Sequence, residues 1–319
     1  MRIVFMGTPE FAVASLDSLL KNNFNIVGVI TAPDKPAGRG QQMHQSPVKN
    51  YAVKNNLKLL QPEKLKDPGF IEDLKNLKAD LQIVVAFRML PDSVWNMPPL
   101  GTYNLHASLL PKFRGAAPIN WAIINGEKET GVTTFKLKHE IDTGNILLSE
   151  RVSIDDAMTA GELHDVLMNV GASLIIKTAN QIQKSSEDKS ELVFLPQDES
   201  KACHAPKLFK ETCKINWDKP VIDIYNLIRG LSPYPTAFTQ IHTGTTSFLL
   251  LKLFKVKYEK VEHRMSNGSV LTDNKNYLKI FCGGGAIDII ELQLEGKKRM
   301  PVDEFLRGFK ISENSKLSW

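Results

Sequence analysis

Three short runs of consecutive apolar residues, separated by segments with helical spacing, constrain the fold of this chain most. The runs are RIVFM (2–6), NIVGVIT (25–31) and LQIVVAF (81–87). Gly7 ends the first run, Pro9 suits the first position of a helix, and the apolar residues that follow recur at helical spacing. Buried parallel strands read as continuous apolar runs rather than as alternating ones. Strands that alternate with helices in this way predict an α/β domain whose sheet is rich in parallel strands.

The remainder of the chain predicts a second, smaller domain built mainly of strands. A helical stretch at 160–186 ends the first part, and another at 219–231 lies near the start of the second. Short strands are expected after it at 237–242, 247–258, 268–271, 277–281 and 286–292. Short strands separated by polar turns favour a small β-barrel. We therefore expect a Rossmann-like domain over 1–189, a linker over 190–206 and a C-terminal domain over 207–319.

Length and cysteine content exclude a small disulfide-bonded scaffold. The chain has 319 residues, which is enough for about two domains. Its cysteines, Cys203, Cys213 and Cys282, form no CxxC pair, so we expect neither a disulfide framework nor a four-cysteine zinc site. The apolar stretch after Arg2 is too short for a signal peptide, and no run approaches the roughly eighteen apolar residues of a membrane span. These features predict a cytoplasmic protein with no membrane partner.

Positive charge is concentrated in the C-terminal part of the chain. The formal net charge of the whole chain is +5. Residues 1–200 carry 21 Lys and Arg against 23 Asp and Glu, whereas residues 201–319 carry 19 against 12. This asymmetry is typical of a domain that binds a polyanion, although a solvated lysine-rich surface gives the same pattern.

A segment rich in proline and glycine, residues 32–47, follows the second apolar run. It lies at the carboxyl end of an expected strand, where ligands bind in open α/β sheets, and it carries the cations Lys35 and Arg39. We expect a long, mobile loop that acts as a lid. A solvated loop without a role is the alternative.

The sequence lacks the usual nucleotide-binding loops. The turn Gly7-Thr8-Pro9 has no second and third glycine of a dinucleotide-binding GxGxxG motif, which argues against a nicotinamide or flavin cofactor. No GxxxxGK[ST] motif is present, so nucleotide hydrolysis has no support.

Residues 101–121 hold the clearest chemical pattern. In an extended strand residues two apart project to the same side, so Asn104 and His106 would face one cleft. A donor amide and an imidazole that holds a proton are what acyl transfer requires around a developing oxyanion. Asp142, in the segment HEIDTG, would orient His106 and stabilise its charged form. The spacing alone leaves two simpler interpretations open, a buried structural histidine and an ordinary turn aspartate.

The segment Ser108–Gly115 reads SLLPKFRG. Pro111 and Gly115 predict a loop with a defined backbone, which would place Arg114 beside the same cleft. The alternative is a structural turn in which Arg114 caps carbonyl groups.

Together these motifs resemble the methionyl-tRNA formyltransferase family. The matching segments run over nearly the whole chain: IVFMGTPEFA (3–12), TAPDKPAGRG (31–40), SPVK (46–49), NLHASLLPKFRGAAPINWAIINGEKETGVT (104–133), IDTG (141–144), IRGLSPYPTAF (228–238) and GKKRM (296–300). The resemblance implies an enzyme that moves the formyl group of 10-formyltetrahydrofolate, without a metal, to the α-amino group of methionine on charged initiator tRNA for translation initiation. It also implies a C-terminal barrel of the OB type that helps to hold the tRNA. We expect a monomer.

The resemblance assigns roles residue by residue. Asn104 and protonated His106 would donate hydrogen bonds to the oxyanion, worth about 3 kcal/mol each, and Asp142 would hold the tautomer of His106 and accept the amine proton. The residues expected to bind the folate and its formyl group are Phe87, Arg88, Leu90, Ser108, Leu109, Leu110, Pro111, Arg114 and Gly115. Those expected to bind tRNA are Lys35 and Arg39 in the lid, and Lys201, Lys207, Lys210 and Lys214 in and after the linker.

The chain departs from the family pattern after the third apolar run. Phe87 and Arg88 stand where the family usually has Tyr-Gly, beside the expected pterin pocket. Arg88 would meet the folate tail or point to solvent, and the sequence does not decide between them. A milder departure is KHEIDTG (138–144), where the family tends to have smaller or more acidic residues before its DTG.

Two other functions compete with this interpretation. A formyltransferase or hydrolase acting on a purine precursor or a nucleotide sugar shares the Asn, His and Asp pattern, but the basic C-terminal part, IRGLSPYPTAF and GKKRM are not expected in it. A tRNA-binding module without catalysis is not expected to retain Asn104, His106 and Asp142.

Overall fold

The chain forms two compact units that interleave along the sequence. The structure is a computed structural model that describes residues 1–37, 42–242, 248–311 and 317–318. The first unit comprises Met1–Gly115, Glu129–Ser153 and His164–His204, and the second comprises Ala116–Lys128, Ile154–Leu163 and Ala205–Trp319. Two segments that lie between parts of the first unit along the sequence, residues 116–128 and 154–163, therefore belong to the second unit. The boundaries expected at residues 189 and 207 stay a prediction.

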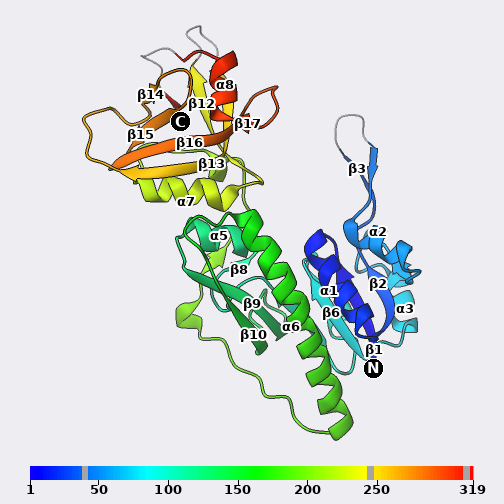
Figure 1. Ribbon diagram of the computed structural model, residues 1–319. Coiled ribbons are helices and arrows are strands. Elements are labelled where there is room, and N and C mark those ends of the chain that lie inside the picture. The colour runs from blue at the N-terminus through cyan, green and yellow to red at the C-terminus, as the bar shows by residue number, and fades with distance from the viewer. Residues whose placement is uncertain (38–41, 243–247, 312–316, 319) are drawn as a thin grey trace. The chain divides into compact units, whose positions relative to one another are not determined.

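A mixed sheet is the framework of the first unit (Figure 1). Its spatial order is β10 (Ile146–Ser153), β9 (Glu129–Lys136), β7 (Thr102–His106), β6 (Leu81–Val85), β1 (Arg2–Gly7), β2 (Asn25–Ile30) and β5 (Leu59–Leu60). Strands β7, β6, β1, β2 and β5 run parallel, whereas β9 and β10 are antiparallel to their neighbours. The three apolar runs are the adjacent strands β6, β1 and β2. The predicted Rossmann-like sheet, rich in parallel strands, is confirmed.

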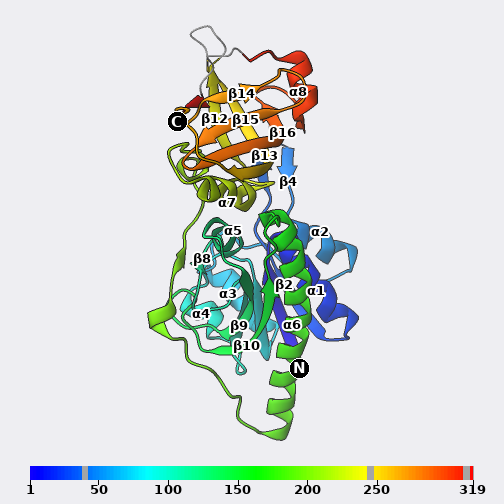
Figure 2. The same ribbon diagram turned by 60° about the vertical axis from the view of Figure 1, so that its left-hand side comes forward.

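Helices cover both faces of this sheet (Figure 2). They are α1 (Glu10–Lys21), α2 (Pro47–Lys54), α3 (Pro68–Asn76), α4 (Asp92–Trp95) and α6 (Ala160–Asp188). On one face α1 and α6 lie close against the strands of the sheet. A Cβ on Gly7 of β1 would lie 2.5 Å from Ala12 Cβ of α1, and a Cβ on Gly171 of α6 would lie 2.8 Å from Leu105 of β7. On the other face residues of β1, β2 and β6 pack against Phe70 and Leu74 of α3 and against α4.

Local signals explain where several of these helices begin. Ser46 caps α2 by accepting a hydrogen bond from Lys49 N at 3.0 Å, and Pro47 follows at the first helical position. Asp67 caps α3 in the same way, because it accepts a hydrogen bond from Phe70 N at 3.0 Å, and Pro68 follows at the first helical position. Such caps satisfy backbone donors that a helix leaves open at its start.

The described residues of the expected lid form two paired strands rather than a long loop. Strand β3 (Lys35–Ala37) pairs antiparallel with β4 (Gln42–His44), so the expectation of a loop across 32–47 is corrected. The strands satisfy each other's backbone groups, which a loop rich in proline and glycine would leave to water. Asp34 anchors the base of the hairpin through an ion pair with Lys49 and a 2.9 Å hydrogen bond from Gln61.

The second unit contains an antiparallel sheet and short helices. The sheet order is β14 (Val270–Thr272), β15 (Leu278–Cys282), β16 (Gly285–Leu294), β13 (Phe248–Lys260), β12 (Ala237–His242) and β18 (Leu317–Ser318), and β17 (Met300–Pro301) pairs with β16. The helices are α5 (Pro118–Ile124), α7 (Val221–Leu231), α8 (Val302–Gly308) and the 3-10 turn η2 (Glu211–Cys213). The predicted strands of the C-terminal part are confirmed as an antiparallel sheet. Its closure into a barrel of the OB type stays a prediction.

The packing of α5 on α7 explains why residues 116–128 belong to the second unit. Asn120 Nδ2 donates to the carbonyl of Gly230 at 2.8 Å, and a Cβ on Gly230 would lie 2.6 Å from Ile124. Side chains of α7, such as Ile224 and Ile228, continue into the core formed with the strands. Within the residues that the structure describes, no helix is long and apolar enough to cross a membrane.

The segment expected as a linker is bound to the first unit over much of its length. Leu195 and Ile146 exchange backbone hydrogen bonds of 2.8 and 2.9 Å. The 3-10 turn η1 (Glu199–Lys201) follows, and β11 (His204–Ala205) pairs with β8 (Arg114–Gly115). Residues 195–204 therefore have fixed partners in the first unit.

Candidate active site

Strand β7 carries Asn104 and His106 on one face of the sheet. The pairing of Asn104 with Val84 of β6 puts both residues on the face that packs against α3 and α4. The side chain of Asn104 is half-buried and has no hydrogen bond to another residue in the part of the chain that the structure describes. Its amide is therefore open to a ligand.

His106 is buried and oriented through one of its ring nitrogens. It is 6% exposed, and Nε2 lies 2.8 Å from the carbonyl oxygen of Phe113. A carbonyl only accepts hydrogen bonds, so Nε2 carries the proton. The other nitrogen, Nδ1, lies 3.8 Å from Asp142 Oδ2, which is too long for a hydrogen bond. In the neutral ring, Nδ1 thus directs its lone pair towards the Asp142 carboxylate.

Asp142 reaches this site from the turn between β9 and β10. Its Oδ2 accepts a hydrogen bond of 2.9 Å from the backbone N–H of Gly115. Its φ of 55° lies in the left-handed region, which aspartate tolerates better than most residues. The structure thus brings together Asp142, His106 and the end of the SLLPKFRG segment, as the sequence predicts for the first two.

Polar contacts fix the backbone of the segment Ser108–Gly115. Ser108 is fully buried, its Oγ donates to Lys112 O at 2.6 Å, and its carbonyl accepts from Thr133 Oγ1 at 2.7 Å. Leu110 packs in a small apolar cluster of the same unit, and Leu109 and Pro111 are half-buried. This loop therefore has the defined backbone that Pro111 and Gly115 predict. Direct contacts of its residues with folate stay a prediction.

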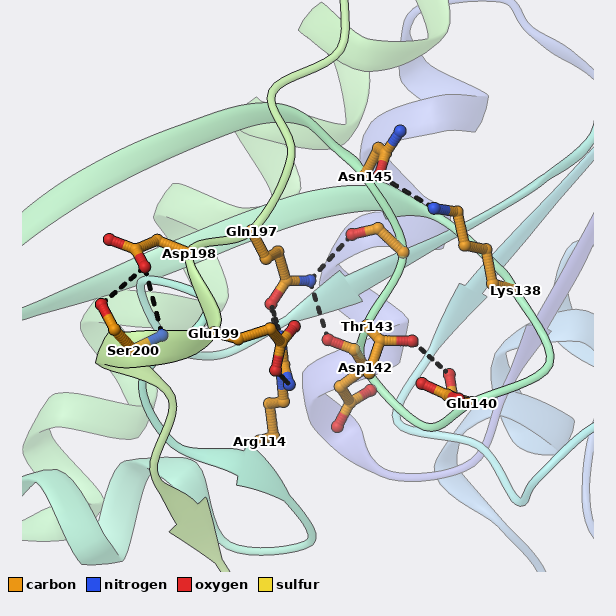
Figure 3. Close-up of polar contacts among 11 residues, drawn as sticks. Arg114, Lys138, Glu140, Asp142, Thr143, Asn145, Gln197, Asp198, Glu199 and Ser200 are labelled. Atoms are coloured by element: carbon orange, nitrogen blue, oxygen red, sulfur yellow. Dashed lines mark hydrogen bonds and ion pairs between the residues drawn. The ribbon is translucent and has the colours of Figure 1, made fainter.

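Arg114 binds the segment that follows α6 (Figure 3). Its guanidinium donates to Gln197 Oε1 and to both carboxylate oxygens of Glu199 at 2.7 to 3.1 Å. The hydrogen bond to Glu199 raises the pKa of Arg114 above its ordinary value, and the same bond lowers the pKa of Glu199. Sequence reasoning left a folate contact and carbonyl capping open for Arg114. The structure gives its guanidinium side-chain partners, Gln197 and Glu199, and a contact of Arg114 with folate stays a prediction.

A cavity of about 590 Å³ opens next to the loop after β6. Its lining residues are Leu65, Lys66, Met89, Leu90, Pro91, Asp92, Ser93 and His139. Leu90 is one of the residues expected to bind folate. A second cavity of about 360 Å³ shares His139 and is lined also by Trp95, Lys136, Leu137, Lys138, Asn145 and Phe194.

Arg88 is exposed, which agrees with the solvent-facing orientation of the two that the sequence left open, and its contact with the folate tail stays a prediction. Its Nη1 donates to Glu63 O at 2.7 Å and its Nη2 to Pro62 O, so the side chain supports the backbone before α3. The guanidinium also lies 5.6 Å from the centre of the half-buried Phe87 ring. Burial lowers the pKa of Arg88 from its ordinary value.

The lysines expected to bind tRNA lie in both units. Lys35, Lys201, Lys207 and Lys210 are exposed, whereas Lys214 is half-buried. Lys201 forms an ion pair with Asp198 at 3.1 Å, and Lys207 Nζ lies 5.9 Å from the centre of the Phe209 ring. Arg39 lies outside the described residues. Among the residues that are described, no group of three or more His, Cys, Asp or Glu side chains is arranged to hold a metal ion.

Sequence reasoning missed the partners that orient the expected residues. Phe113 holds His106, and Gln197 and Glu199 hold Arg114. Gln197 and Glu199 follow Arg114 by 83 and 85 positions, in a polar segment that reads as a linker. Their residue types carry no signal, because the contact depends on the tertiary pairing of Leu195 with Ile146.

Comparison with known proteins gives the family. The formyl transferase model matches residues 1–179, and the model of the formyl transferase C-terminal domain matches residues 207–310. The methionyl-tRNA formyltransferase of Bacteroides fragilis is 51% identical to this chain over 321 residues, covering 99% of the chain and 98% of that relative. The one from Phocaeicola vulgatus is 53% identical over 318 residues, covering 99% and 98%.

A solved structure shares the fold at lower identity. The N-formyltransferase from Helicobacter canadensis, solved in complex with folinic acid and dTDP-3-aminofucose, superposes with a TM-score of 0.64 and 23% identity. The match covers 90% of this chain and 98% of that protein. From the family models and the full-length identity of about one half, this chain belongs to the formyl transferase family, among the methionyl-tRNA formyltransferases.

Proposed function

We propose that this protein transfers the formyl group of 10-formyltetrahydrofolate to the α-amino group of methionine on charged initiator tRNA, giving N-formylmethionyl-tRNA for translation initiation. One observation carries the proposal. Asn104, His106 and Asp142 gather in one unit of a chain that is about 51% identical, over its full length, to methionyl-tRNA formyltransferases. These residue types are suited to acyl transfer to an amine.

Asn104 supports the transition state in this reaction. The amine nitrogen forms a bond to the formyl carbon and loses a proton, and the formyl oxygen becomes an oxyanion. The bond from carbon to the folate nitrogen then breaks as the carbonyl forms again and that nitrogen takes up a proton. The Asn104 amide, which has no partner among the described residues, donates to that oxyanion. A donor of this kind is worth about 3 kcal/mol when it is removed.

Asp142 and His106 take up the proton that the amine loses. His106 Nε2–H is held by Phe113, so Nδ1 is the ring nitrogen open to a proton, and it faces Asp142 Oδ2. A proton bound at Nδ1 turns this contact into an ion pair between the imidazolium and the Asp142 carboxylate. For His106 to donate to the oxyanion as well, Nε2–H has to exchange Phe113 O for the substrate oxygen.

The cavity of about 590 Å³ is the site that we propose for the folate. Its volume lies in the range of roughly 300–1,000 Å³ that is usual for small-molecule pockets. Met89, Leu90 and Pro91 supply apolar contacts, and Asp92 and Ser93 supply polar groups for a ring with hydrogen-bonding edges. Phe87, Arg88 and the segment Ser108–Gly115 complete the proposed folate and formyl site.

The basic C-terminal part is the proposed tRNA-binding surface. Residues 201–319 carry seven more basic than acidic side chains, and phosphate contacts of exposed lysines give affinity that falls steeply with salt. We assign such contacts to the exposed Lys201, Lys207 and Lys210 and to the half-buried Lys214. We assign contacts near the acceptor end to Lys35 in β3 and to Arg39, which lies outside the described residues. We further propose a cytoplasmic monomer.

Formyl transfer from 10-formyltetrahydrofolate to methionine-charged initiator tRNA tests the proposal. Uncharged tRNA, free methionine and a dTDP-amino sugar are run in parallel. Product from the charged tRNA alone is expected. Transfer to the amino sugar, or release of formate with no transfer, would overturn the proposed acceptor.

A further inference from the structure

The side-chain amide of Gln197 joins two parts of the site (Figure 3). Its Nε2 donates to the carbonyl oxygens of Asp142 and Gly144, each at 2.8 Å. Its Oε1 accepts from Arg114 Nη2 at 2.7 Å and from Nε at 3.1 Å. The half-buried amide thus uses both N–H groups and both acceptor positions within this site.

These partners allow only one orientation of the amide. A guanidinium only donates and a carbonyl only accepts, so a flipped Gln197 would place like groups against each other on both sides. Arg114 is itself fixed, since it is 8% exposed and its Nη1 and Nη2 also donate to the Glu199 carboxylate at 2.8 and 2.7 Å. Glu199, Arg114 and Gln197 therefore direct two N–H groups at the Asp142 turn.

The Asp142 turn has a backbone that needs this support. The φ of Asp142 lies in the left-handed region, which residues with a side chain seldom occupy. The turn is also packed tightly, because a Cβ on Gly144 would lie 1.8 Å from the carbonyl oxygen of Lys136. Gln197 binds the carbonyls on both sides of Thr143. The direction of the Asp142 carboxylate, towards Gly115 N and His106, follows from this backbone.

We propose that Gln197 is a positioning residue for the formyl transfer, acting on the reaction through Asp142, with Arg114 and Glu199 fixing its amide. This inference rests on the proposed function, because it adds a residue to the same site. It predicts that the two N–H donors of Gln197, rather than its contact with Arg114, set the turnover rate.

The substitutions Gln197→Glu and Gln197→Met separate these two contacts. Glutamate keeps an oxygen for Arg114 but turns a carboxylate oxygen towards the two carbonyl oxygens. Methionine has nearly the same shape, carries no charge and removes all four hydrogen bonds. We expect kcat to fall at least about tenfold in both variants, with KM for 10-formyltetrahydrofolate and charged tRNA within about twofold of wild type. A role limited to tethering through Arg114 would leave Gln197→Glu at the wild-type kcat.

Two control variants test whether any mutation in this segment, or any added negative charge, lowers kcat. Ser200→Ala removes a hydrogen bond to Asp198 in the same segment, and Gln183→Glu adds a carboxylate on α6, where the amide donates to Glu187. Both are expected to keep kcat within about twofold. Thermal unfolding of every variant checks that the protein is folded under the assay conditions.

A double-mutant cycle with Asp142→Asn gives the deciding measurement. If Gln197 acts through Asp142, adding Gln197→Met to Asp142→Asn lowers the residual rate no further, because contacting residues of one network are not additive. Full additivity, or a wild-type kcat in both Gln197 variants, would overturn the inference alone. A wild-type protein that forms no formylmethionyl-tRNA in the same assay would refute the proposed function and this inference with it.

Discussion

Replacing Asp142 by asparagine removes the charge that faces His106 while leaving the shape of the site nearly unchanged. Asparagine tolerates the left-handed φ of 55°, and its amide oxygen can accept the Gly115 N–H that Asp142 Oδ2 accepts at 2.9 Å. The carboxylate 3.8 Å from His106 Nδ1 is lost, and with it the proton acceptor. General-base catalysis contributes about 10²–10⁴-fold, so we expect kcat to fall by that factor, which is roughly 3–5 kcal/mol of activation free energy.

The cost in stability distinguishes asparagine from alanine at this position. Exchanging a charged for a neutral acceptor of one hydrogen bond costs about 1 kcal/mol. Alanine leaves the Gly115 N–H without its acceptor and places a less tolerant residue in the left-handed region, for a total of roughly 3 kcal/mol. At about 2–4 °C per kcal/mol, Tm falls by about 3 °C for Asp142→Asn and by roughly 10 °C for Asp142→Ala.

Single-turnover formyl transfer to charged initiator tRNA measures the chemical step, and calorimetry of the free protein measures Tm. Binding of charged tRNA is the control, and it is expected to be unchanged in the asparagine variant. A kcat within about threefold of wild type for Asp142→Asn would refute the proton-acceptor role. Equal losses of Tm in the two variants would refute the backbone argument.

Three further predictions follow from individual contacts. Exchanging Lys207 and Lys210 together for alanine should weaken tRNA binding and reduce the slope of log affinity against log salt by about 2, and an unchanged slope would remove them from the interface. Arg114 lowers the pKa of Glu199, so this pair stabilises the protein fully above the ordinary glutamate pKa of about 4.3 and loses its effect as pH falls through the lowered value. The Tm difference between wild type and Glu199→Gln should therefore be constant near neutral pH and vanish on acidification, whereas a difference that grows on acidification would contradict the pairing. Gly131→Ala would place a Cβ 2.1 Å from a backbone carbonyl of β10, and we expect a loss of about 3 kcal/mol in chemical unfolding, with a loss below 1 kcal/mol as the contrary result.

The parts of the fold that the sequence predicts are those with local, repeated signals. Strands β1 and β6 are buried over nearly their whole length and β2 over its second half, so each is a continuous apolar run bounded by a helix. Strand β5 is only Leu59–Leu60, and β3 and β4 contain proline and polar residues, so neither length nor pattern marks them. The membership of residues 116–128 in the second unit depends on the contact of α5 with α7, which has no local signal.

The residues of the site likewise fall into those that a local pattern predicts and those that only long-range contacts bring together. Asn104 and His106 are two apart in one strand, so strand periodicity alone predicts that they share a face. The contact of Asp142 with Gly115, and that of Arg114 with Gln197, join segments 27 and 83 positions apart. The protein partners of Arg114 and Arg88 have no local signal either, and the folate contacts expected for these two residues stay a prediction. In the fold both guanidinium groups bind groups of the protein itself.

The hydrogen-bond partners of the site indicate which of its groups are left for the substrates. Asp142 Oδ2 is held by Gly115 and His106 Nε2 by Phe113, and the Gln197 amide has a protein partner on each side. Buried polar groups without partners are costly, so a folded protein keeps them mainly where a ligand satisfies them. In the described part of the chain, the Asn104 amide, His106 Nδ1 and Asp142 Oδ1 have no hydrogen bond. A donor for an oxyanion and acceptors for a proton are what addition of an amine to a formyl group requires.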